Sequence, residues 1–461
     1  MASFPQYYIR FIAIGWTRNL IYLIVLTTAL PWLCWRRFRT KRYQAGLKQK
    51  LRGLSRSILA ATNAAGNASP TALASDPAPL IWLHGVSVGE VQLLKPLLAR
   101  WKMRHPDWRF ALSTTTDSGM ELARKSLGKD IPLFYFPLDF TWSVARTLDS
   151  LAPAILVLGE LELWPNLIDA CVHRRIPVAV INGRLSVRSF TRYQKMRWLT
   201  RGMFNELSLV AAQSESNAER FRQCGAERTT IVTGSIKFDN VSFDRQAPEV
   251  AQLRQWAGIL PEHRVWIMGS TQAGEELPAV RAWQELYNQF PELKLIVVPR
   301  HPDRFDQVAE EIEQSGVRMR RRSTALGSLN GDDWDVLLVD SVGELKWWWG
   351  LAEIAVVGGS FGARGGQNML EPAAYGANVA FGPNTSNFRD IVELLLAGDA
   401  AARLPSLAEL SDWLRQQLLD PLPGNARGQR AQAIIASGAG ALDRTLDALD
   451  ELPMCHVAER G

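Results

Sequence analysis

The sequence predicts an α/β protein with two Rossmann-like domains, each a parallel sheet wound by helices. Apolar segments of strand length alternate with helix-length segments from residue 80 onward, which is the pattern of βαβ units. The alternation lapses into a polar, proline-containing stretch over residues 240–249 and then starts again. Glycines and charged side chains follow the strands, and open α/β sheets bind ligands at these carboxyl ends.

Each predicted strand is a short apolar run bounded by glycine, proline or polar residues. The first series is 81–84, 110–114, 133–136, 155–158, 178–182, 209–213 and 230–234. The second series is 265–269, 295–299, 336–340, 354–358 and 379–382. The segments between them, such as 90–104 and 276–290, have the length and periodicity of helices.

We divide the 461 residues into four segments. They are a membrane anchor with a basic flank (1–42), an amphipathic segment with a low-complexity linker (43–79), an N-terminal domain (80–240) and a C-terminal domain that includes the final helix (241–461). Two such domains facing one another would form a cleft lined by strand ends.

The amino-acid composition limits which classes of binding partner are expected. A hydrophobic content of 47% with 21% charged residues indicates a globular protein. The net charge of +6 favours an anionic partner or surface, but no zinc spacing, RNA-binding signature or lysine tract supports nucleic acid. The four cysteines are scattered singly, which is typical of a reducing compartment.

The N-terminus carries a continuous apolar run from Leu20 to Trp35, followed by five basic residues between 36 and 42. The run is short for a span of ~20 residues, so both a signal-anchor helix and a monotopic helix remain open. A cleavable signal peptide is disfavoured, because no small-residue cleavage site follows. The positive-inside rule predicts that the rest of the chain is cytoplasmic.

The stretch from Leu80 to Glu90 contains the first ligand-side loop. Leu80 to Leu83 predicts a buried strand, and the glycines at 85 and 89 permit a tight turn before a helix. Glu90 falls in the first turn of that helix, where the helix dipole is expected to keep its carboxylate ionised. A helix cap would explain a lone glutamate, but the position at a strand's carboxyl end favours a functional role.

Further polar segments follow other strands of the first domain. Glu160 and Glu162 come after the strand 155–158, toward the edge that carries Glu90, although solvated loop acids would look alike. Lys237 closes the domain beside the predicted cleft. Residues 184–201 are rich in arginine and lysine, as either a solvated helix face or a surface for anionic lipid.

The second domain has four polar loops at strand ends, over residues 269–275, 299–302, 340–344 and 358–371. The glycine-rich loop leads into a helix whose free amides suit a phosphate, and Arg364 adds charge. Glu371 is placed to accept hydrogen bonds from ribose hydroxyls, and Arg300 to bind a phosphate or carboxylate. Each loop alone is explained as a turn, whereas four on one sheet edge predict a ligand site.

Two segments of the sequence also match motifs of other chemistries. Gly85–Gly89 matches the G-x-S-x-G pattern of serine hydrolases, with Ser87 as nucleophile and His301 or His456 as its partner. This would place the nucleophile on the first strand of its sheet, and a second complete domain follows. Asp332–Asp335 resembles an acidic metal-binding motif, but it precedes a strand, so we interpret it as a loop and predict no metal site.

Seven motifs, taken together in chain order, resemble those of the 3-deoxy-D-manno-octulosonic acid (Kdo) transferases of lipid A and lipopolysaccharide assembly. The matching segments run to about Ile391 and are His84–Glu90, Ser113–Gly119, Glu160–Asn166, Asn182–Ser186, Gly234–Asp239, Pro299–Pro302 and Gly365–Pro372.

The resemblance implies an inverting glycosyltransferase of the GT-B fold, with an N-terminal membrane-anchor helix. It implies transfer of Kdo from CMP-Kdo to a lipid A precursor (lipid IVA) in lipopolysaccharide biosynthesis, without a metal or other cofactor. It also implies that the enzyme lies at the cytoplasmic face of the cell inner membrane.

The resemblance also assigns residue roles. Glu90 would be the base that deprotonates the acceptor hydroxyl, and Glu162 and Lys237 would stabilise the transition state. The residues that would contact CMP are Pro299, Arg300, Val342, Gly343, Glu344, Asn368, Met369, Leu370 and Glu371.

Two departures from the family pattern keep alternatives open. Gln272 and Gln367 stand where the family has histidines, and an amide cannot carry charge near neutral pH. The alternatives are a GT-B transferase with another nucleotide sugar or acceptor, and a catalytically silent, membrane-tethered nucleotide-binding module.

Overall fold

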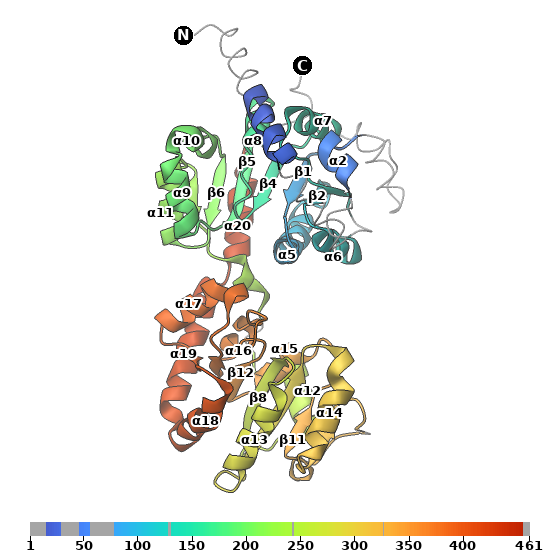
Figure 1. Cartoon of the computed structure of the whole chain (residues 1–461), viewed down its shortest axis with the longest axis vertical. Helices are drawn as coiled ribbons and strands as arrows, with labels where there is room; N and C mark the ends of the chain where they lie inside the picture. Colours follow the sequence, from blue (N-terminus) through green and yellow to red (C-terminus); the bar gives the residue numbers. More distant parts are fainter. Residues whose placement is uncertain are drawn as a thin grey trace. The chain divides into compact units, whose positions relative to one another are not determined.

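The computed structural model describes residues 15–28, 46–55, 78–127, 131–241, 244–325 and 327–454. The chain forms two compact units (Figure 1), of which unit 1 comprises Met1–Asp239 with Gly440–Gly461 and unit 2 comprises Asn240–Ala439. Each unit is built on a seven-stranded sheet in which every assigned strand pair is parallel. The predicted pair of parallel α/β domains is thereby confirmed.

The sheet of unit 1 has the order β3-β2-β1-β4-β5-β6-β7. Its strands are β1 (Leu80–His84), β2 (Arg109–Thr114), β3 (Leu133–Tyr135), β4 (Ile155–Gly159), β5 (Val178–Gly183), β6 (Leu209–Ala212) and β7 (Thr230–Val232). The order reverses between β1 and β4, so the loops that follow these two neighbours diverge there. Such a switch point is where doubly wound sheets bind ligands.

Helices cover both faces of this sheet. They are α2 (Leu47–Arg52), α5 (Val88–Arg104), α6 (Asp117–Leu127), α7 (Thr141–Leu151), α8 (Pro165–His173), α9 (Val187–Lys195), α10 (Arg197–Asn205), α11 (Glu215–Cys224), the 3₁₀ helix η1 (Ile236–Asn240) and α20 (Ala441–Asp450). Successive strand residues point to opposite faces, so Trp82 joins one apolar cluster while Ile81 and Leu83 join the other.

The sheet of unit 2 has the order β10-β11-β9-β8-β12-β13-β14 and reverses between β8 and β12. Its strands are β8 (Arg264–Thr271), β9 (Leu293–Pro299), β10 (Met319–Arg321), β11 (Val336–Leu338), β12 (Ile354–Val357), β13 (Asn378–Phe381) and β14 (Ala402–Arg403). Its α-helices are α12 (Pro248–Ala257), α13 (Glu276–Tyr287), α14 (Phe305–Gln314), α15 (Leu345–Trp348), α16 (Leu370–Ala374), α17 (Arg389–Ala397), α18 (Leu410–Leu419) and α19 (Pro421–Gly438). The 3₁₀ helices η2 (Pro302–Arg304), η3 (Gly331–Asp333), η4 (Trp349–Leu351), η5 (Ser386–Phe388) and η6 (Leu407–Glu409) lie between them.

The last helix, α20, belongs to unit 1, which differs from the expectation that 241–461 forms one domain. The reason is an apolar face, on which Leu442, Leu446 and Leu449 join the core cluster of β1 and α5. Arg104 strengthens the contact by pairing with Asp443 at 2.8 Å and with other α20 carboxylates.

Residues 15–28 form a helix that is held to unit 1 through its polar side. Asn19 donates to the Thr141 hydroxyl at 2.7 Å and accepts from the Thr141 amide, and the Tyr22 hydroxyl donates to Asp139 at 2.9 Å. Arg18 forms an ion pair with Asp169. Among the described residues, no helix has the length and apolar character needed to cross a bilayer. The expected anchor helix is therefore not seen, and much of the apolar run lies outside the described residues.

Candidate functional site

Glu90 lies at the switch point of the unit 1 sheet, in the first turn of α5 directly after β1. Its carboxylate accepts a hydrogen bond from the Val86 amide at 2.6 Å and another from the Ser87 hydroxyl at 3.0 Å. Glu90 therefore closes the turn before its own helix, as a cap would. Because the Ser87 hydroxyl donates to a carboxylate, its geometry does not support the serine hydrolase.

The loop after β4 approaches Glu90 closely. A Cβ on Gly159 would lie 3.9 Å from the Glu90 side chain and 3.3 Å from the His84 carbonyl oxygen, so a glycine leaves room for the contact. Glu160 follows with a φ of 58°, in the left-handed region that non-glycine residues rarely adopt. Strain of this kind concentrates at functional sites. The left-handed backbone at Glu160 directs the loop that carries Glu160 and Glu162 toward Glu90.

Lys237 reaches the same cluster from η1. Its ammonium lies 3.5 Å from a carboxylate oxygen of Glu160, with both side chains partly exposed. Asn182 fixes the preceding turn, because its buried side-chain oxygen accepts from the Ser235 hydroxyl at 3.3 Å and the Ile236 amide at 3.2 Å. The predicted residues Glu90, Glu162 and Lys237 are thus brought to one edge of one sheet.

Burial dominates the electrostatics of the acids. It raises the pKa of Glu162 to about 7, with further increases from the Glu90 and Glu160 carboxylates and opposition from the Trp164 indole, which donates at 3.2 Å. Burial also raises the pKa of Glu90, against the Val86 amide and the Lys237 charge. The expectation that the helix dipole keeps Glu90 readily ionised is wrong in direction, because desolvation outweighs it.

In unit 2, Glu275 connects the loops that follow β8 and β12. Its buried carboxylate accepts from the Gly359 amide at 2.8 Å and from the Gln272 amide at 2.9 Å. A Cβ on Gly358 would lie 2.7 Å from the Glu275 carboxylate, so the contact requires a glycine there. The glycine-rich loop is therefore held in one shape before any ligand arrives.

Gln272 and Gln367, the two departures from the family pattern, flank the same residue. A Cβ on Gly359 would lie 3.2 Å from Gln367 and 3.5 Å from Gln272. The Gln272 side-chain nitrogen is buried and has no hydrogen-bond partner among the described residues. The two glutamines that replace the family's histidines therefore both lie beside Gly359.

Arg300 and Glu371 meet at this edge. Burial raises the pKa of Glu371, and the Asn368 amide together with the charges of Lys346 and Arg300 opposes the rise. Asn368 donates to Glu371 at 3.0 Å and accepts from the Leu370 amide at 3.1 Å, which shapes the start of α16. The chain therefore places a cation after β9, and an amide and a carboxylate after β12, at the ends of the two strands that flank β8.

Other predicted donor residues differ in what they offer a ligand. Met369 and Leu370 are both buried. Val342, in the loop after β11, is 77% exposed and presents an apolar surface. Glu344 is already engaged by Arg322 at 3.1 and 3.2 Å, which lowers its pKa although burial acts the other way. Pro299 ends β9, and Gly343 has a φ of 93°.

Three polar side chains with structural roles at the site were not singled out from the sequence. Asn182 has a left-handed φ of 51°, and an asparagine before a glycine at a strand end is the signal that indicates it. Glu275 lies in a predicted loop, but nothing in its spacing indicates its burial. Glu276 forms a buried bidentate pair with Arg304 at 2.8 and 3.1 Å. No group of three metal-type ligands occurs among the described residues.

Solved structures place this fold in a class. UDP-GlcNAc 2-epimerase from Neisseria meningitidis, bound to UDP-GlcNAc, is 14% identical with a TM-score of 0.52 over 81% of this chain and 100% of that one. At this identity the likeness concerns the fold alone. Two parallel α/β units with loops at the switch point of each sheet are the GT-B architecture.

Sequence relatives identify the family. The profile described as 3-Deoxy-D-manno-octulosonic-acid transferase (kdotransferase) matches residues 55–240. The 3-deoxy-D-manno-octulosonic acid transferase of Haemophilus influenzae is 34% identical over 82% of this chain and 88% of its own length. The chain belongs to the Kdo transferase family, and it is a glycosyltransferase. The C-terminal CMP-Kdo binding domain of WaaA from Acinetobacter baumannii is 32% identical, with a TM-score of 0.38 over 41% of this chain and 96% of that one.

Proposed function

We propose that this enzyme transfers Kdo from CMP-Kdo to the lipid A precursor lipid IVA, with inversion and without a metal. The observation that carries the proposal is the clustering of Glu90, Glu162 and Lys237 at the switch point of one sheet, in a chain of the Kdo transferase family.

Glu90 acts as the general base in this proposal. The acceptor hydroxyl loses its proton to the Glu90 carboxylate while its oxygen attacks the anomeric carbon of Kdo, and the bond from that carbon to the CMP phosphate breaks. A raised pKa suits this role, because a carboxylate with greater proton affinity is a stronger base. The bonds from Val86 and Ser87 fix its orientation.

Lys237 and Glu162 act on the charges that develop. An ionised Glu162 offsets the positive charge of the oxocarbenium-like centre, and the Lys237 ammonium offsets the negative charge of the departing phosphate. For the donor, Arg300 binds phosphate, while the Asn368 side chain and the Glu371 carboxylate bind ribose hydroxyls. The exposed Val342 side chain offers an apolar contact for the base.

We further propose that unit 1 attaches to the cytoplasmic face of the inner membrane. The helix over residues 15–28 supports this, because its polar side is used in docking and its apolar side is exposed. Five of its apolar side chains are more than half exposed: Trp16, Leu20, Ile21, Ile24 and Val25. An amphipathic helix with such a face lies in a membrane interface.

Helices α9 and α10 offer a second surface of the same character. Trp198 is 85% exposed and Val187 is 63% exposed, and no residue of α9 is buried. The exposed basic residues around them are Arg188, Arg192, Lys195, Arg197 and Arg201. An exposed tryptophan among basic residues suits a headgroup region with anionic lipid.

The test is incubation of the purified full-length enzyme with CMP-Kdo and a tetraacylated lipid A precursor. We expect release of CMP and a heavier lipid product by mass spectrometry, with at least about 100-fold slower turnover in Glu90→Gln, since general-base catalysis contributes this much. CMP release no faster in the wild type than in Glu90→Gln would contradict the proposal.

Use of another nucleotide sugar is a second candidate, because Gln272 and Gln367 flank the same glycine. The shift of the unfolding temperature on adding CMP, UDP or GDP distinguishes Kdo transfer from the use of another nucleotide sugar. Kdo transfer predicts stabilisation by CMP, whereas stabilisation by UDP alone would favour the second candidate.

A further inference from the structure

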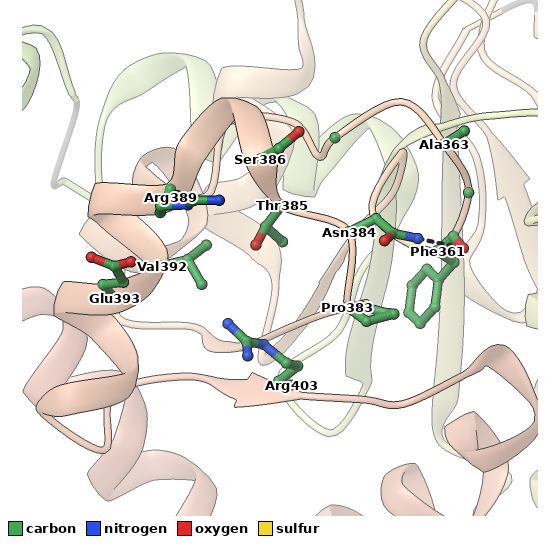
Figure 2. A pocket seen from close by; sticks show the side chains of 12 residues that line it. Phe361, Ala363, Pro383, Asn384, Thr385, Ser386, Arg389, Val392, Glu393 and Arg403 are labelled. Atoms are coloured by element: carbon green, nitrogen blue, oxygen red, sulfur yellow. Dashed lines mark hydrogen bonds between the residues drawn. The ribbon is translucent and has the colours of Figure 1, made fainter. Parts of the chain in front are cut away.

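A hollow of about 620 Å³ opens at the carboxyl ends of the strands of the unit 2 sheet (Figure 2). None of the predicted CMP-contacting residues lines it. Its walls are the loops that follow β12 and β13, the start of α17 and the end of β14. Because parallel strands end at the same edge, these segments meet there. The lining residues that carry the argument are Gly365, Thr385, Ser386, Arg389, Glu393 and Arg403.

Two arginines of this hollow are without acidic partners. Arg389 and Arg403 are exposed, and neither side chain forms a hydrogen bond or ion pair with a described residue. Other arginines of unit 2 are paired: Arg304 with Glu276, Arg318 with Asp335 and Arg322 with Glu344. The chain thus leaves two guanidinium groups at one hollow, where a bidentate oxyanion is the matching ligand.

The remaining polar groups suit a hydroxylated ligand. Figure 2 shows Arg403 extending from β14 toward Thr385 and Val392, while Arg389 and Glu393 come from α17. Thr385 and Ser386 supply hydroxyls beside the arginines. The Glu393 carboxylate has no partner among the described residues and can accept hydrogen bonds from sugar hydroxyls. The lining therefore fits an acidic, polyhydroxylated group.

The hollow is continuous with the donor loop. The Asn387 amide donates to the Gly365 carbonyl at 2.9 Å, and its side chain donates to the Arg364 carbonyl at 2.8 Å. Gly365 has a φ of 84°, and a Cβ there would lie 2.5 Å from the Ser386 hydroxyl, so only glycine fits. Gly365 also precedes Asn368 by three positions, which brings the hollow next to the residues predicted to hold the nucleotide.

We propose that this hollow binds the carboxylate of the sugar acid carried by the donor, an inference that rests on the proposed function. Arg389 and Arg403 are the carboxylate partners, and Glu393 accepts from the hydroxyls of the same sugar. The hollow thereby selects an acidic sugar over a neutral one. A phosphate on the acceptor lipid offers similar oxyanion chemistry, but the shared Gly365 loop favours the donor.

The experiment compares the nucleotide with the nucleotide sugar. In full-length enzyme carrying Arg389→Ala and Arg403→Ala together, we expect the KM for CMP-Kdo to rise about tenfold or more, the loss of a charge-assisted contact. The Kd for CMP, measured by calorimetry, should stay within about twofold, because CMP lacks the sugar carboxylate. Arg281→Ala, an exposed arginine on α13 outside the hollow, is the matched control.

Each other outcome counts against the proposal. An unchanged KM for CMP-Kdo in the double variant overturns it, and a raised KM for the acceptor lipid alone reassigns the hollow to the acceptor phosphate. An equal loss of CMP and CMP-Kdo affinity, which we expect of Arg300→Ala, would also overturn it. If the wild type does not turn over CMP-Kdo, the proposed function fails, whereas failure of the hollow alone leaves wild-type turnover intact.

Discussion

At the scale of single residues, the cluster at the unit 1 sheet edge holds three carboxylates and one ammonium. The Glu160 charge adds to the raised pKa of Glu90, and the Glu90 and Glu160 charges add to the raised pKa of Glu162, while the Lys237 ammonium lies 3.5 Å from Glu160. Because the acids are partly buried, water compensates this repulsion poorly. The cluster is therefore held in place at a cost in stability.

The raised pKa of Glu162 allows this cost in stability to be measured. Its pKa is about 7 in the folded protein against an ordinary 4.5, so folding takes up a proton between these values. The free energy of unfolding should therefore fall as the pH rises from about 4.5 to 7. We expect Glu162→Gln to unfold at higher denaturant than the wild type at pH 8, by roughly 1–2 kcal/mol after screening by solvent, with no gain at pH 4.5.

The control is Glu121→Gln, an exposed glutamate on α6, which should show no such pH-dependent gain. Glu162→Gln should also lose turnover, because a neutral amide cannot offset positive charge in the transition state. A variant that is less stable than the wild type at pH 8 would contradict the cause assigned to the pKa.

The residues of the cluster could be predicted from the sequence, but their protonation could not. Each acid follows a strand, and this is readable from apolar runs and glycines. The pKa of Glu90 depends on its burial and on Glu160, which follows a strand adjacent in space but distant in sequence. The pairing of Gln272 and Gln367 around Gly359 is hidden for the same reason.

At the scale of elements, the turn between β7 and η1 decides where Lys237 lies. Its anchor is Asn182, at the end of β5, which bonds to Ser235 and Ile236. Asn182 is fully buried and has a left-handed backbone. Its side chain therefore holds the turn by hydrogen bonds, and its backbone conformation ends the strand. The turn thus links the end of β5 to the Lys237 ammonium.

We expect Asn182→Ala to lower the free energy of unfolding by about 2–4 kcal/mol, from a lost buried hydrogen bond and a strained backbone. Turnover should fall more than tenfold as Lys237 loses its position, while the Kd for CMP is unchanged. Asn182→Gly keeps the backbone freedom and should recover part of the stability without the turnover. Equal turnover in the wild type and both variants would show that the turn does not position Lys237.

The sequence predicted the elements of the two sheets better than it predicted their flanking helices. Strands of a buried parallel sheet are apolar runs, so all seven strands of the first sheet and five of the second were predicted. The sequence did not predict β10 and β14, because they have three and two residues and contain arginine. The helix over residues 15–28 turns its polar side inward, which apolar periodicity alone cannot show. The position of α20 was missed because an apolar face fits either unit until its ion pairs with Arg104 are known.

At the scale of the whole molecule, α20 completes the core of unit 1 from the far end of the chain. Leu446 is fully buried in the cluster shared with β1 and α5. Asp239 accepts from the Leu442 amide at 2.6 Å and from the Gly440 amide, which caps α20 at the residue where unit 1 resumes. The helix is therefore an integral part of unit 1.

We expect Leu446→Ala to lower the free energy of unfolding of unit 1 by about 2–5 kcal/mol, the cost of a cavity in a packed core. Leu422→Ala on α19, at a leucine that is 74% exposed, should change it by less than about 0.5 kcal/mol. Chemical denaturation measures both. Equal effects of the two variants would mean that α20 contributes nothing to the core.

The division of unit 1 into two chain segments also sets an order of synthesis. All of unit 2 is translated between Asp239 and Gly440, which takes roughly 10–40 s at 5–20 residues per second. During that interval the apolar residues of β1 and α5 that α20 will cover lack the contacts that α20 supplies. Unit 2 is continuous and needs no such wait. The acidic cluster at Glu90 therefore gains its completed scaffold only after the ribosome has made unit 2.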